Sequence, residues 1–331
     1  MTGMPPELEH YLRESLGERL EIEPLAGDAS TRAYYRIRTS SGDRFMVAYY
    51  PDSEREALGR FVQAWEAISH HAPVPRIVHH GACAIVQQDV GDVTLFELLE
   101  TDPQRALKLY RRAIDLVAAF QKSPAAASRI NPPFTTNQFF TELAMTREFW
   151  VERMCGESDP AILEKLDPLF LTLAEAVASH PYVLCHRDFH GQNLHVIKDD
   201  IYLIDYQDLR MGPDTYDLAS LLRDRGVARA LGEDAERDLI EYYRGRAKRG
   251  EGTVERYYET LLQRSIKIVG TFAKQSITRG RHHYLAYIPP TLESIRLCIG
   301  QLPRYRELLD LFPTEPSLEA RAAVQKEGAS A

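Results

Sequence analysis

The spacing of apolar residues changes near residue 94, and this change limits what the chain can fold into. Before it, residues 34–38 and 44–50 are rich in aromatic and β-branched side chains, and the run 40–43 between them favours a turn. This pattern is typical of a β-hairpin. A second pair of strands is expected within residues 76–88. The first part of the chain is therefore expected to form an antiparallel sheet.

Helical periodicity appears once between the strand pairs and dominates after residue 94. Apolar residues three and four apart predict amphipathic helices over residues 54–69, between the strand pairs, and over 107–121. Further helices are expected over about 137–155, 160–179, 215–230, 234–248, 252–279 and 291–310. Strands followed by a long run of helices are typical of α+β proteins. We predict a small antiparallel-sheet lobe over residues 1–88 and a larger, mainly helical lobe over residues 89–331.

Composition argues against several kinds of partner. The 40 Lys and Arg residues against 48 Asp and Glu give a net charge of −8, and non-specific nucleic-acid binding needs a positive field. No run approaches the roughly 18 apolar residues of a membrane span, and the first twelve residues lack the apolar stretch of a signal peptide. The four cysteines are scattered, which favours reduced thiols. We expect a cytoplasmic monomer that binds neither nucleic acid nor membrane.

A β-rich island over residues 182–206 carries the residues with the clearest chemistry. Two short apolar runs surround the polar residues 198–200, and this pattern predicts a further β-hairpin. A hairpin returns the chain beside its own start, so Asn193 and Asp205 are expected to face each other across roughly 5 Å. An amide oxygen and a carboxylate at that separation can share a hard cation such as Mg²⁺.

The loop that enters this hairpin reads H-R-D-x-x-x-x-N from His186 to Asn193, which matches the catalytic loop of protein kinases. In that template the Asp, here Asp188, accepts the proton of the substrate hydroxyl. The Asn binds metal, and a later Asp, here Asp205, bridges metal and nucleotide phosphates. Phosphoryl transfer depends on positioning and charge neutralisation more than on covalent chemistry. The spacing therefore predicts Asp188 as base and Asn193 and Asp205 as metal ligands.

These motifs make the sequence similar to the aminoglycoside phosphotransferase-like kinases, a branch of the protein-kinase-like fold. The run 212–221 resembles the segment that follows the metal-binding Asp in that family. The runs 27–37, 187–190, 205–208 and 263–270 resemble in particular the bacterial N-acetylmuramate/N-acetylglucosamine 1-kinases of cell-wall recycling. The resemblance implies a bilobal kinase-like fold, with ATP and Mg²⁺ as cofactors. It also implies phosphorylation of a small-molecule sugar, at the anomeric O1 of an N-acetylated amino sugar.

The nucleotide site departs from the kinase pattern. Kinases carry a Lys on the third strand, in V-A-I-K, whereas this chain reads Val-Ala-Tyr-Tyr over residues 47–50 and has no G-x-G-x-x-G run. The expected phosphate-binding residues are therefore Asp28, Ala29, Ser30, Thr31 and Arg32, with Arg36 as a further cation. The resemblance makes residues 85–92 the hinge, with Gln88, Asp89 and Val90 beside the adenine.

The substrate is predicted from weaker signals. Arg264 and Lys267 lie three apart on one helix face, where they suit the lactyl carboxylate of N-acetylmuramate or form a solvated surface stripe. Arg187 is compatible with bracing the loop or with a phosphate contact. Asp208 is compatible with a substrate contact or with solvent. Asp217 is expected to tie its helix to the catalytic loop.

Three other functions stay open. One is an aminoglycoside or other small-molecule O-phosphotransferase. Another is a non-catalytic, nucleotide-binding pseudokinase, which the missing Lys does not exclude. The third is a non-haem iron oxygenase, because His186, Asp188 and His190 form H-x-D-x-H. That class needs a strand-rich fold, whereas helices are predicted here after residue 94. Mg²⁺-dependent ATP turnover, against iron binding with 2-oxoglutarate turnover, separates the first and third classes.

Overall fold

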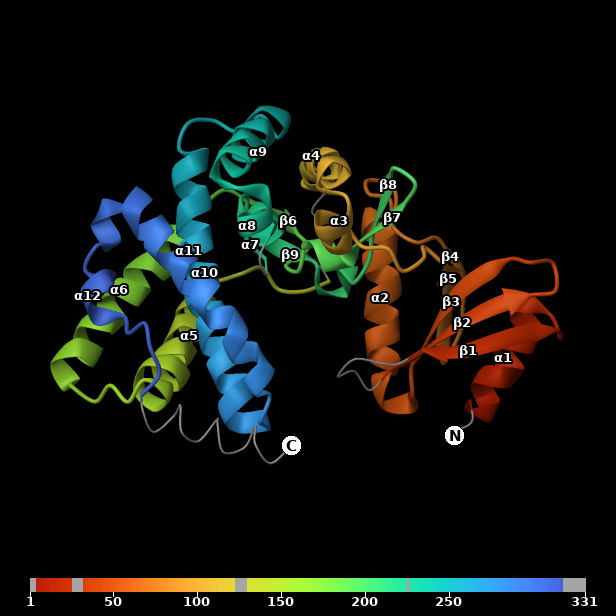
Figure 1. The fold of residues 1–331 in the computed structure, drawn as a ribbon. Coiled ribbons are helices and arrows are strands. Elements are labelled where there is room, and N and C mark those ends of the chain that lie inside the picture. The colour runs from red at the N-terminus through yellow and green to blue at the C-terminus, as the bar shows by residue number, and fades with distance from the viewer. Residues whose placement is uncertain (1–3, 26–31, 123–129, 225–226, 318–331) are drawn as a thin grey trace. The chain divides into compact units, whose positions relative to one another are not determined.

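The protein is described from a computed structural model that covers residues 4–25, 32–122, 130–224 and 227–317 (Figure 1). The chain forms two compact units. Unit 1 consists of residues 1–131 and 191–209, and unit 2 of residues 132–190 and 210–331. The predicted lobes, 1–88 and 89–331, follow the change from strands to helices rather than the bounds of these units, and they stay a prediction.

Unit 1 is built around a five-stranded sheet with the order β1-β2-β3-β5-β4, antiparallel throughout. Its strands are β1 (Leu20–Leu25), β2 (Ala33–Thr39), β3 (Arg44–Tyr49), β4 (Ile77–His80) and β5 (Ala84–Gln88). The two predicted strand pairs are confirmed as β2–β3 and β4–β5, and pairing of β3 with β5 joins them.

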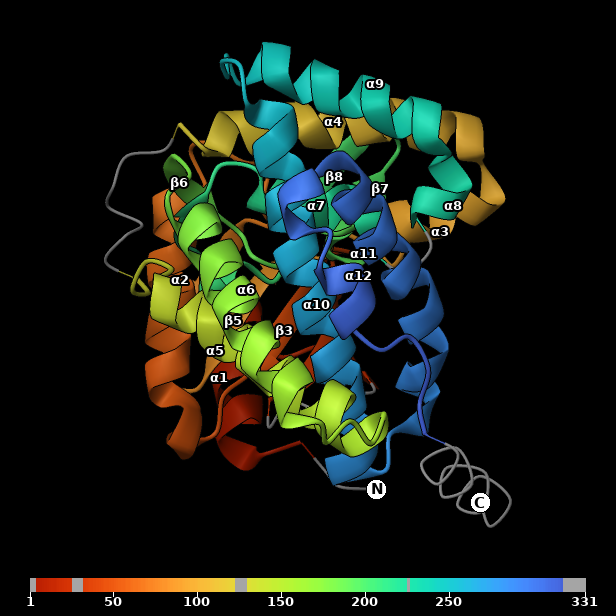
Figure 2. The same cartoon turned by 90° about the vertical axis from the view of Figure 1, so that its left-hand side faces the viewer.

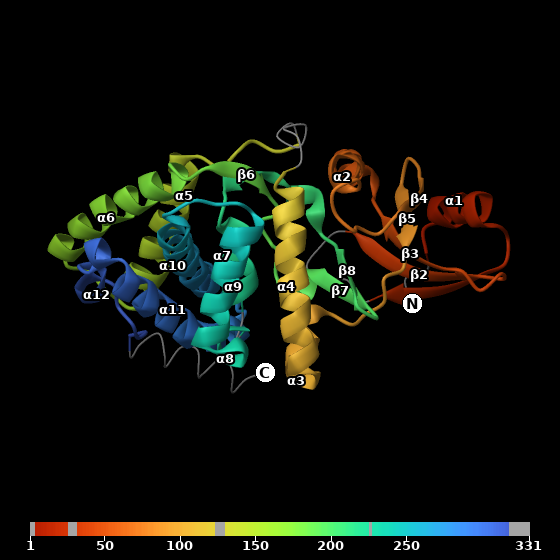
Figure 3. The same cartoon turned by 90° about the horizontal axis from the view of Figure 1, so that it is seen from above.

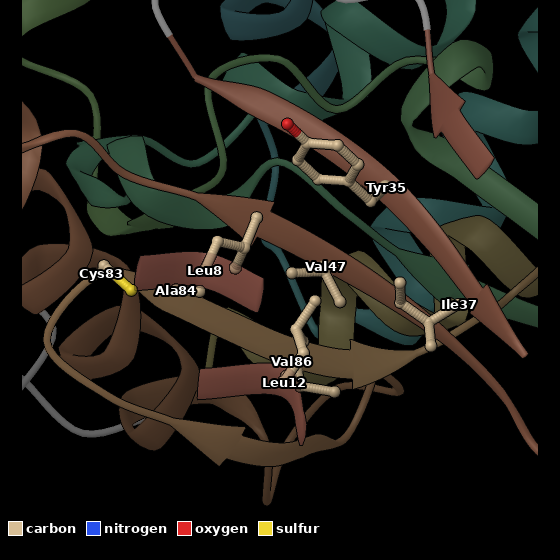
Figure 4. Close-up of a cluster of buried hydrophobic side chains, with 8 residues drawn as sticks. All are labelled: Leu8, Leu12, Tyr35, Ile37, Val47, Cys83, Ala84 and Val86. Atoms are coloured by element: carbon tan, nitrogen blue, oxygen red, sulfur yellow. The ribbon is translucent and has the colours of Figure 1, made fainter. Parts of the chain in front are cut away.

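Helix α1 (Pro6–Leu16) packs against this sheet. Leu8 and Leu12 are fully buried in one cluster with Ile37 of β2 and Val47 of β3 (Figure 4). Burying a leucine contributes about 1.5–3 kcal/mol. The sequence patterns did not predict α1 or β1. Strand β1 reads Leu-Glu-Ile-Glu-Pro-Leu, and its charges and proline suit only an edge strand, a place that pairing with β2 gives it.

Further helices and another hairpin, β7–β8, complete unit 1. They are α2 (Arg55–Ile68), α3 (Leu95–Thr101), α4 (Pro103–Phe120), β7 (Leu194–Ile197) and β8 (Asp200–Leu203). The hairpin β7–β8 confirms the predicted one, but its turn has two residues rather than three, because Ile197 pairs with Asp200. Such turns need a positive φ, and Lys198 has a φ of 55°. Arg105 and Arg112 of α4 donate to the carbonyls of Lys198 and Asp199, so α4 holds the turn (Figure 3).

Unit 2 is mainly helical, and α10 (Thr253–Arg279) is its longest described helix (Figure 2). The other helices are α5 (Thr136–Thr146), α6 (Pro160–Ala178), α7 (Tyr216–Arg223), α8 (Val227–Leu231), α9 (Glu233–Arg246), α11 (Ile288–Gln301) and α12 (Leu308–Leu311). Strands β6 (Tyr182–Cys185) and β9 (Arg210–Pro213) pair antiparallel. A Cβ on Gly270 of α10 would lie 2.5 Å from the Thr146 Cα, so a larger residue would separate α10 from α5.

Several predicted helices end earlier than expected. Helix 137–155 is α-helical only to Thr146 and continues as a π-helix over Arg147–Met154. The predicted helix 291–310 stops at Gln301 because Pro303 follows it. In the described residues no helix is long and apolar enough to cross a membrane. All four cysteines are free, and three of them are buried.

Candidate active site

The loop after β6 carries Asp188, and Asp217 of α7 holds this loop by its backbone. The N–H groups of His186 and Arg187 donate to the two carboxylate oxygens of Asp217, at 2.7 and 3.0 Å. Asp217 is fully buried, and burial raises its pKa even though His186 and these amides favour the charged form. Arg187 has a φ of 80°, which is uncommon for a residue with a side chain. The supporting role predicted for Asp217 is confirmed.

Asp188 lines a cavity of about 950 Å³ that lies within unit 2. Arg264 and Lys267 of α10, two of the predicted substrate residues, line the same cavity. Apolar side chains that include Ile268 and Phe272 form another part of the wall. A cavity of this volume with a few polar groups among apolar ones is typical of small-molecule sites.

Positive groups surround the Asp188 carboxylate. Partial desolvation raises its pKa, but the charges of Arg264, His186, Arg187 and Lys267 outweigh this effect, so the pKa lies below its ordinary value. Asp188 is accessible from the cavity side despite this partial desolvation. At neutral pH it therefore carries a negative charge and can accept a proton or a hydroxyl hydrogen bond.

Arg264 is held firmly in this wall. It is 9% exposed, and it donates to Ser220 Oγ at 2.9 Å and to the Arg187 carbonyl at 3.3 Å. Its guanidinium carbon lies 4.4 Å from the centre of the Tyr216 ring. These contacts link α10 both to α7 and to the catalytic loop.

Lys267 is also paired inside unit 2. Its Nζ lies 3.1 Å from Glu142 Oε1, and Gln263 Nε2 donates to the other oxygen of Glu142 at 2.9 Å. Burial lowers the pKa of Lys267, but Tyr216 and Glu142 outweigh this effect and raise it, so the ammonium stays charged. The reading of Arg264 and Lys267 as a solvated surface stripe is therefore wrong.

Asn193 and Asp205 lie at the open end of the β7–β8 hairpin in unit 1. The Ile204 N–H donates to the Asn193 carbonyl at 3.0 Å, so the register of Leu194 with Leu203 continues to Asn193 with Ile204. The expectation that Asn193 faces Asp205 is therefore wrong by one residue, because Asp205 comes one residue after the end of the ladder. Asp205 is exposed with a left-handed φ of 62°, and its carboxylate accepts from Gln207 Nε2 at 2.6 Å. Two protein oxygens suit Mg²⁺, which keeps waters and takes phosphate oxygens as its other ligands.

A site made of protein ligands alone is not found in the part of the chain that the structure describes, because no three His, Cys, Asp or Glu side chains gather there as a metal site would need. His186, which the H-x-D-x-H reading would use as a ligand, is fully buried. Its ring meets that of Phe189 edge-on, at 6.0 Å between centroids. The iron-oxygenase alternative therefore has no support here.

The predicted phosphate loop is described only at its end. Asp28, Ala29, Ser30 and Thr31 lie outside the described residues. Arg32 Nη1 lies 3.4 Å from the hydroxyl oxygen of Tyr50. Arg36, the other predicted cation, pairs with Asp89 and Asp92, at 3.0 and 2.6 Å.

The predicted hinge residues belong to the same unit. The Gln88 N–H donates to the Arg76 carbonyl at 2.9 Å, so this amide is already used by the protein. The Asp89 side chain is 3% exposed and pairs with Arg36 and Arg44. The Asp89 carboxylate therefore has a structural role. A contact between adenine and the backbone of Asp89 or Val90 stays a prediction. Asp208 ends the 3-10 turn Tyr206–Asp208 of unit 1 and is half-buried.

Much of the cavity wall was not predicted. It includes Arg223, Arg229, Glu233, Tyr287 and Glu293. These residues come from α7, α8, the start of α9 and the chain around α11, and no short spacing connects them. Packing of these elements on α10 brings them together, so a single sequence carries no local signal for them.

Solved structures with low sequence identity share the fold. The aminoglycoside phosphotransferase APH(2")-IIa, solved with gentamicin, matches with a TM-score of 0.63 at 12% identity, over 89% of this chain and 99% of that one. A Plasmodium vivax ethanolamine kinase matches with a TM-score of 0.61 at 13% identity, over 91% of this chain and 88% of that one. The predicted α+β, kinase-like fold is confirmed.

Sequence relatives agree with this fold. A Pseudomonas aeruginosa protein named N-acetylmuramate/N-acetylglucosamine kinase is 26% identical, over 94% of this chain and 93% of its own length. A Neisseria meningitidis protein of the same name is 26% identical, over 92% of this chain and 93% of its own length. The profile of the phosphotransferase enzyme family matches residues 21–252, which is more than half of the chain. The protein is therefore a phosphotransferase and belongs to the phosphotransferase enzyme family.

Proposed function

We propose that this protein is an ATP-dependent kinase that phosphorylates the anomeric O1 of N-acetylmuramate or N-acetylglucosamine, in the cytoplasm during cell-wall recycling. The observation that carries the proposal is the cavity of unit 2, where the Asp188 carboxylate is joined by Arg264 and Lys267. The names of the relatives that match over nearly the whole chain support the choice of sugar.

Asp188 is the group that acts on the acceptor. It takes the hydrogen bond of the sugar hydroxyl and then its proton as the oxygen attacks the γ-phosphorus. The bond from that phosphorus to the β–γ bridging oxygen breaks, and ADP leaves with the electron pair. Its lowered pKa keeps it ionised at neutral pH, so it is ready to orient the hydroxyl in the ground state. Arg187, Arg264 and Lys267 keep positive charge near this carboxylate, which suits the approach of a phosphate group.

The donor side is assigned to unit 1. Asn193 and Asp205 would hold Mg²⁺, which neutralises phosphate charge when it is bound. Asp28, Ala29, Ser30, Thr31 and Arg32 would hold the phosphates, and the backbone near Gln88, Asp89 and Val90 would contact the adenine. Asp208 is kept as a candidate substrate contact from the sequence alone.

Recognition of N-acetylmuramate needs a cation for its lactyl carboxylate, and we assign this role to Arg229. Arg223 also lines the cavity, but its Nε donates to Glu236 at 2.7 Å. Glu236 is only 4% exposed, so removing its partner would leave a buried charge without compensation. Lys267 is paired with Glu142. Arg229 is exposed at the cavity wall and makes no ion pair with any residue that the structure describes.

The lactyl group supplies a further argument for Arg229. It is attached at C3 of the sugar, two ring carbons from the hydroxyl at C1. The cations that act most strongly on Asp188 include Arg264 and Lys267 but not Arg229. The residue that reads the lactyl carboxylate should lie away from the base, and Arg229 meets this requirement better than Arg264 or Lys267.

One observation favours a second function, phosphorylation of aminoglycosides. Four carboxylates line the cavity: Asp188, Asp224, Glu233 and Glu293. Aminoglycosides are polycations, and several carboxylates in one pocket would suit them. We rank this function second because the same cavity is lined by as many cations, namely Arg223, Arg229, Arg264 and Lys267.

A coupled assay of ATP consumption tests the proposal with N-acetylmuramate, N-acetylglucosamine and a kanamycin-type amine as acceptors. We expect Mg²⁺-dependent turnover with the two sugars and a product in which O1 carries the phosphate, identified by NMR. Turnover with the amine alone would replace the proposal by the second function. ATP binding without turnover on any acceptor would instead indicate a pseudokinase.

A further inference from the structure

The third strand of the sheet has no lysine where kinases use one to hold the nucleotide phosphates. In V-A-I-K the Lys is the fourth residue, and the matching residue here is Tyr50, directly after β3. Tyr50 is 1% exposed, so it belongs to the interior of unit 1. A neutral phenol cannot replace the positive charge of the missing ammonium group, and that charge must come from another residue.

Arg32 lies beside Tyr50. It directly precedes β2, whose first residue Ala33 is opposite Tyr49. The Arg32 guanidinium carbon lies 5.6 Å from the centre of the Tyr50 ring, and its Nη1 lies 3.4 Å from the hydroxyl oxygen. A guanidinium over an aromatic face is held by cation–π attraction, so Tyr50 is a platform that orients Arg32.

The Arg32 guanidinium also interacts electrostatically with the proposed metal ligand, Asp205. Burial lowers the pKa of Arg32, but the oxygens of Tyr34 and Tyr50 and the carboxylate of Asp205 outweigh burial and raise it. Asp205 also acts on Tyr34 and Tyr50, whose pKa values are raised chiefly by burial. The next residue, Tyr206, packs its ring on Phe61 of α2, with centroids 4.8 Å apart. Arg32, Tyr34, Tyr50 and Asp205 therefore form one electrostatic cluster in unit 1.

Arg36 is a poor alternative for this role. It lies four residues further along β2, roughly 13 Å away at the rise of a strand. Its side chain is committed to Asp89 and Asp92, at 3.0 and 2.6 Å. The Asp89 side chain is 3% exposed, so turning Arg36 toward a ligand would weaken the compensation of a buried carboxylate.

We propose that Arg32, positioned by the Tyr50 ring and hydroxyl, is the cation that binds the nucleotide phosphates in place of the third-strand lysine. The assignment rests on the proposed use of ATP. Arginine suits the role because its planar guanidinium can donate two parallel hydrogen bonds to phosphate oxygens. Its electrostatic interaction with Asp205 suits a place near the phosphates that the metal would also contact.

The test measures ATP binding to the whole protein by calorimetry, with Mg²⁺ and without sugar, and then KM for each substrate. Arg32→Met should weaken ATP binding and raise KM for ATP by roughly tenfold or more, the effect of losing hydrogen bonds to a charged group. KM for the sugar should stay within about twofold, because only donor binding changes. Arg32→Lys should recover part of the loss, and Tyr50→Phe should have a smaller effect.

The matched control is Arg38→Met. Arg38 lies on β2, the strand that follows Arg32, and is exposed with its Nε 3.8 Å from Glu21 Oε2; its loss should leave ATP binding unchanged. Adding Tyr50→Lys to Arg32→Met returns an ammonium group to the third strand and should restore part of the binding if that double variant keeps its melting temperature.

Unchanged ATP binding by a folded Arg32→Met protein would overturn the assignment. Failure of the wild-type protein to bind ATP at all would instead contradict the proposed function. Binding of ATP with activity on an unexpected acceptor would leave the Arg32 assignment standing, because the binding measurement contains no acceptor.

Discussion

The two units hold their functional residues in different ways. In unit 2 buried side chains do this: Asp217 accepts from two amides of the catalytic loop, and Arg264 joins α10 to Ser220 and to the Arg187 carbonyl. In unit 1 Asn193 and Asp205 follow the open end of the β7–β8 ladder, where Asn193 is opposite Ile204, and the Asp205 side chain is exposed. The proposed acceptor site is thus preorganised by side chains, whereas the proposed donor site keeps the exposed Asp205 carboxylate for a metal.

This difference predicts which properties substitutions in each unit should change. Changes in unit 2 should affect the acceptor step and the stability of the loop together, because the same buried groups serve both. Changes at the hairpin end of unit 1 should affect metal and nucleotide use with little loss of stability, since exposed side chains contribute little to packing.

The largest effect is expected from Asp188→Asn. Loss of a positioned general base lowers rates by about 10²–10⁴-fold, while ATP binding should be unchanged because the residues proposed to bind ATP lie in unit 1. The measurement is kcat with the best sugar, beside calorimetry of ATP. Near-normal kcat would remove Asp188 from the role of base.

Asp205→Asn should be the next largest. Replacing a charged ligand by a neutral one should lower the rate by roughly 10²-fold at fixed Mg²⁺ and move the saturation curve to higher Mg²⁺ concentration. Asp199→Asn, an exposed carboxylate in the turn of the same hairpin, is the control and should behave as the wild type. An unchanged Mg²⁺ curve for Asp205→Asn would contradict the metal assignment.

Asp217→Ala tests whether the same buried carboxylate supports both the loop that carries Asp188 and the stability of unit 2. It leaves the amides of His186 and Arg187 without their acceptor, at about 1–3 kcal/mol for each buried group. The melting temperature and kcat should fall together. If kcat falls while the melting temperature is unchanged, the carboxylate has a direct chemical role rather than a supporting one.

Arg229→Gln should separate the two sugars. With the cation removed, kcat/KM for N-acetylmuramate should fall by roughly tenfold, the effect of one lost charged hydrogen bond, whereas that for N-acetylglucosamine should change less than about twofold. The control is Arg237→Gln on α9, an exposed arginine that pairs with Asp234. An equal fall in kcat/KM for both sugars would show that Arg229 does not bind the lactyl carboxylate.

The smallest effect concerns acid stability and His180. Burial lowers its pKa from 6.5 to about 4, and its Nε2 lies 2.9 Å from Glu259 Oε2. Between these two pKa values the unfolded chain binds the proton and the folded chain does not, so stability falls as pH drops from 6.5 toward 4. Urea unfolding at several pH values checks this, and His180→Asn should show a weaker dependence in that window. An equal dependence in both proteins would assign the effect to other groups.

The sequence-based predictions were accurate for structure formed by neighbouring residues and less accurate where segments far apart in the chain come into contact. The β7–β8 hairpin was predicted because its pattern, alternating apolar residues around a polar turn, is contained in about ten consecutive residues. The first helix and β1 were missed, because β1 reads as a strand only when it lies at the edge of the sheet beside β2. The alternative of a solvated stripe for Arg264 and Lys267 was wrong for a similar reason, since the groups that pair with them come from α5 and α7.

The sequence by itself determined the order of strands and helices, the H-R-D-x-x-x-x-N spacing of Asp188 and Asn193, and the hairpin that leads to Asp205. These features depend on backbone geometry over short distances, which residue type and spacing control directly. Only the tertiary structure decided that Arg32 lies on Tyr50, that Arg229 shares a cavity with Asp188, and that Asp217 holds the catalytic loop. Each of these contacts joins segments far apart in the chain or depends on how several elements pack, and no local pattern records such packing.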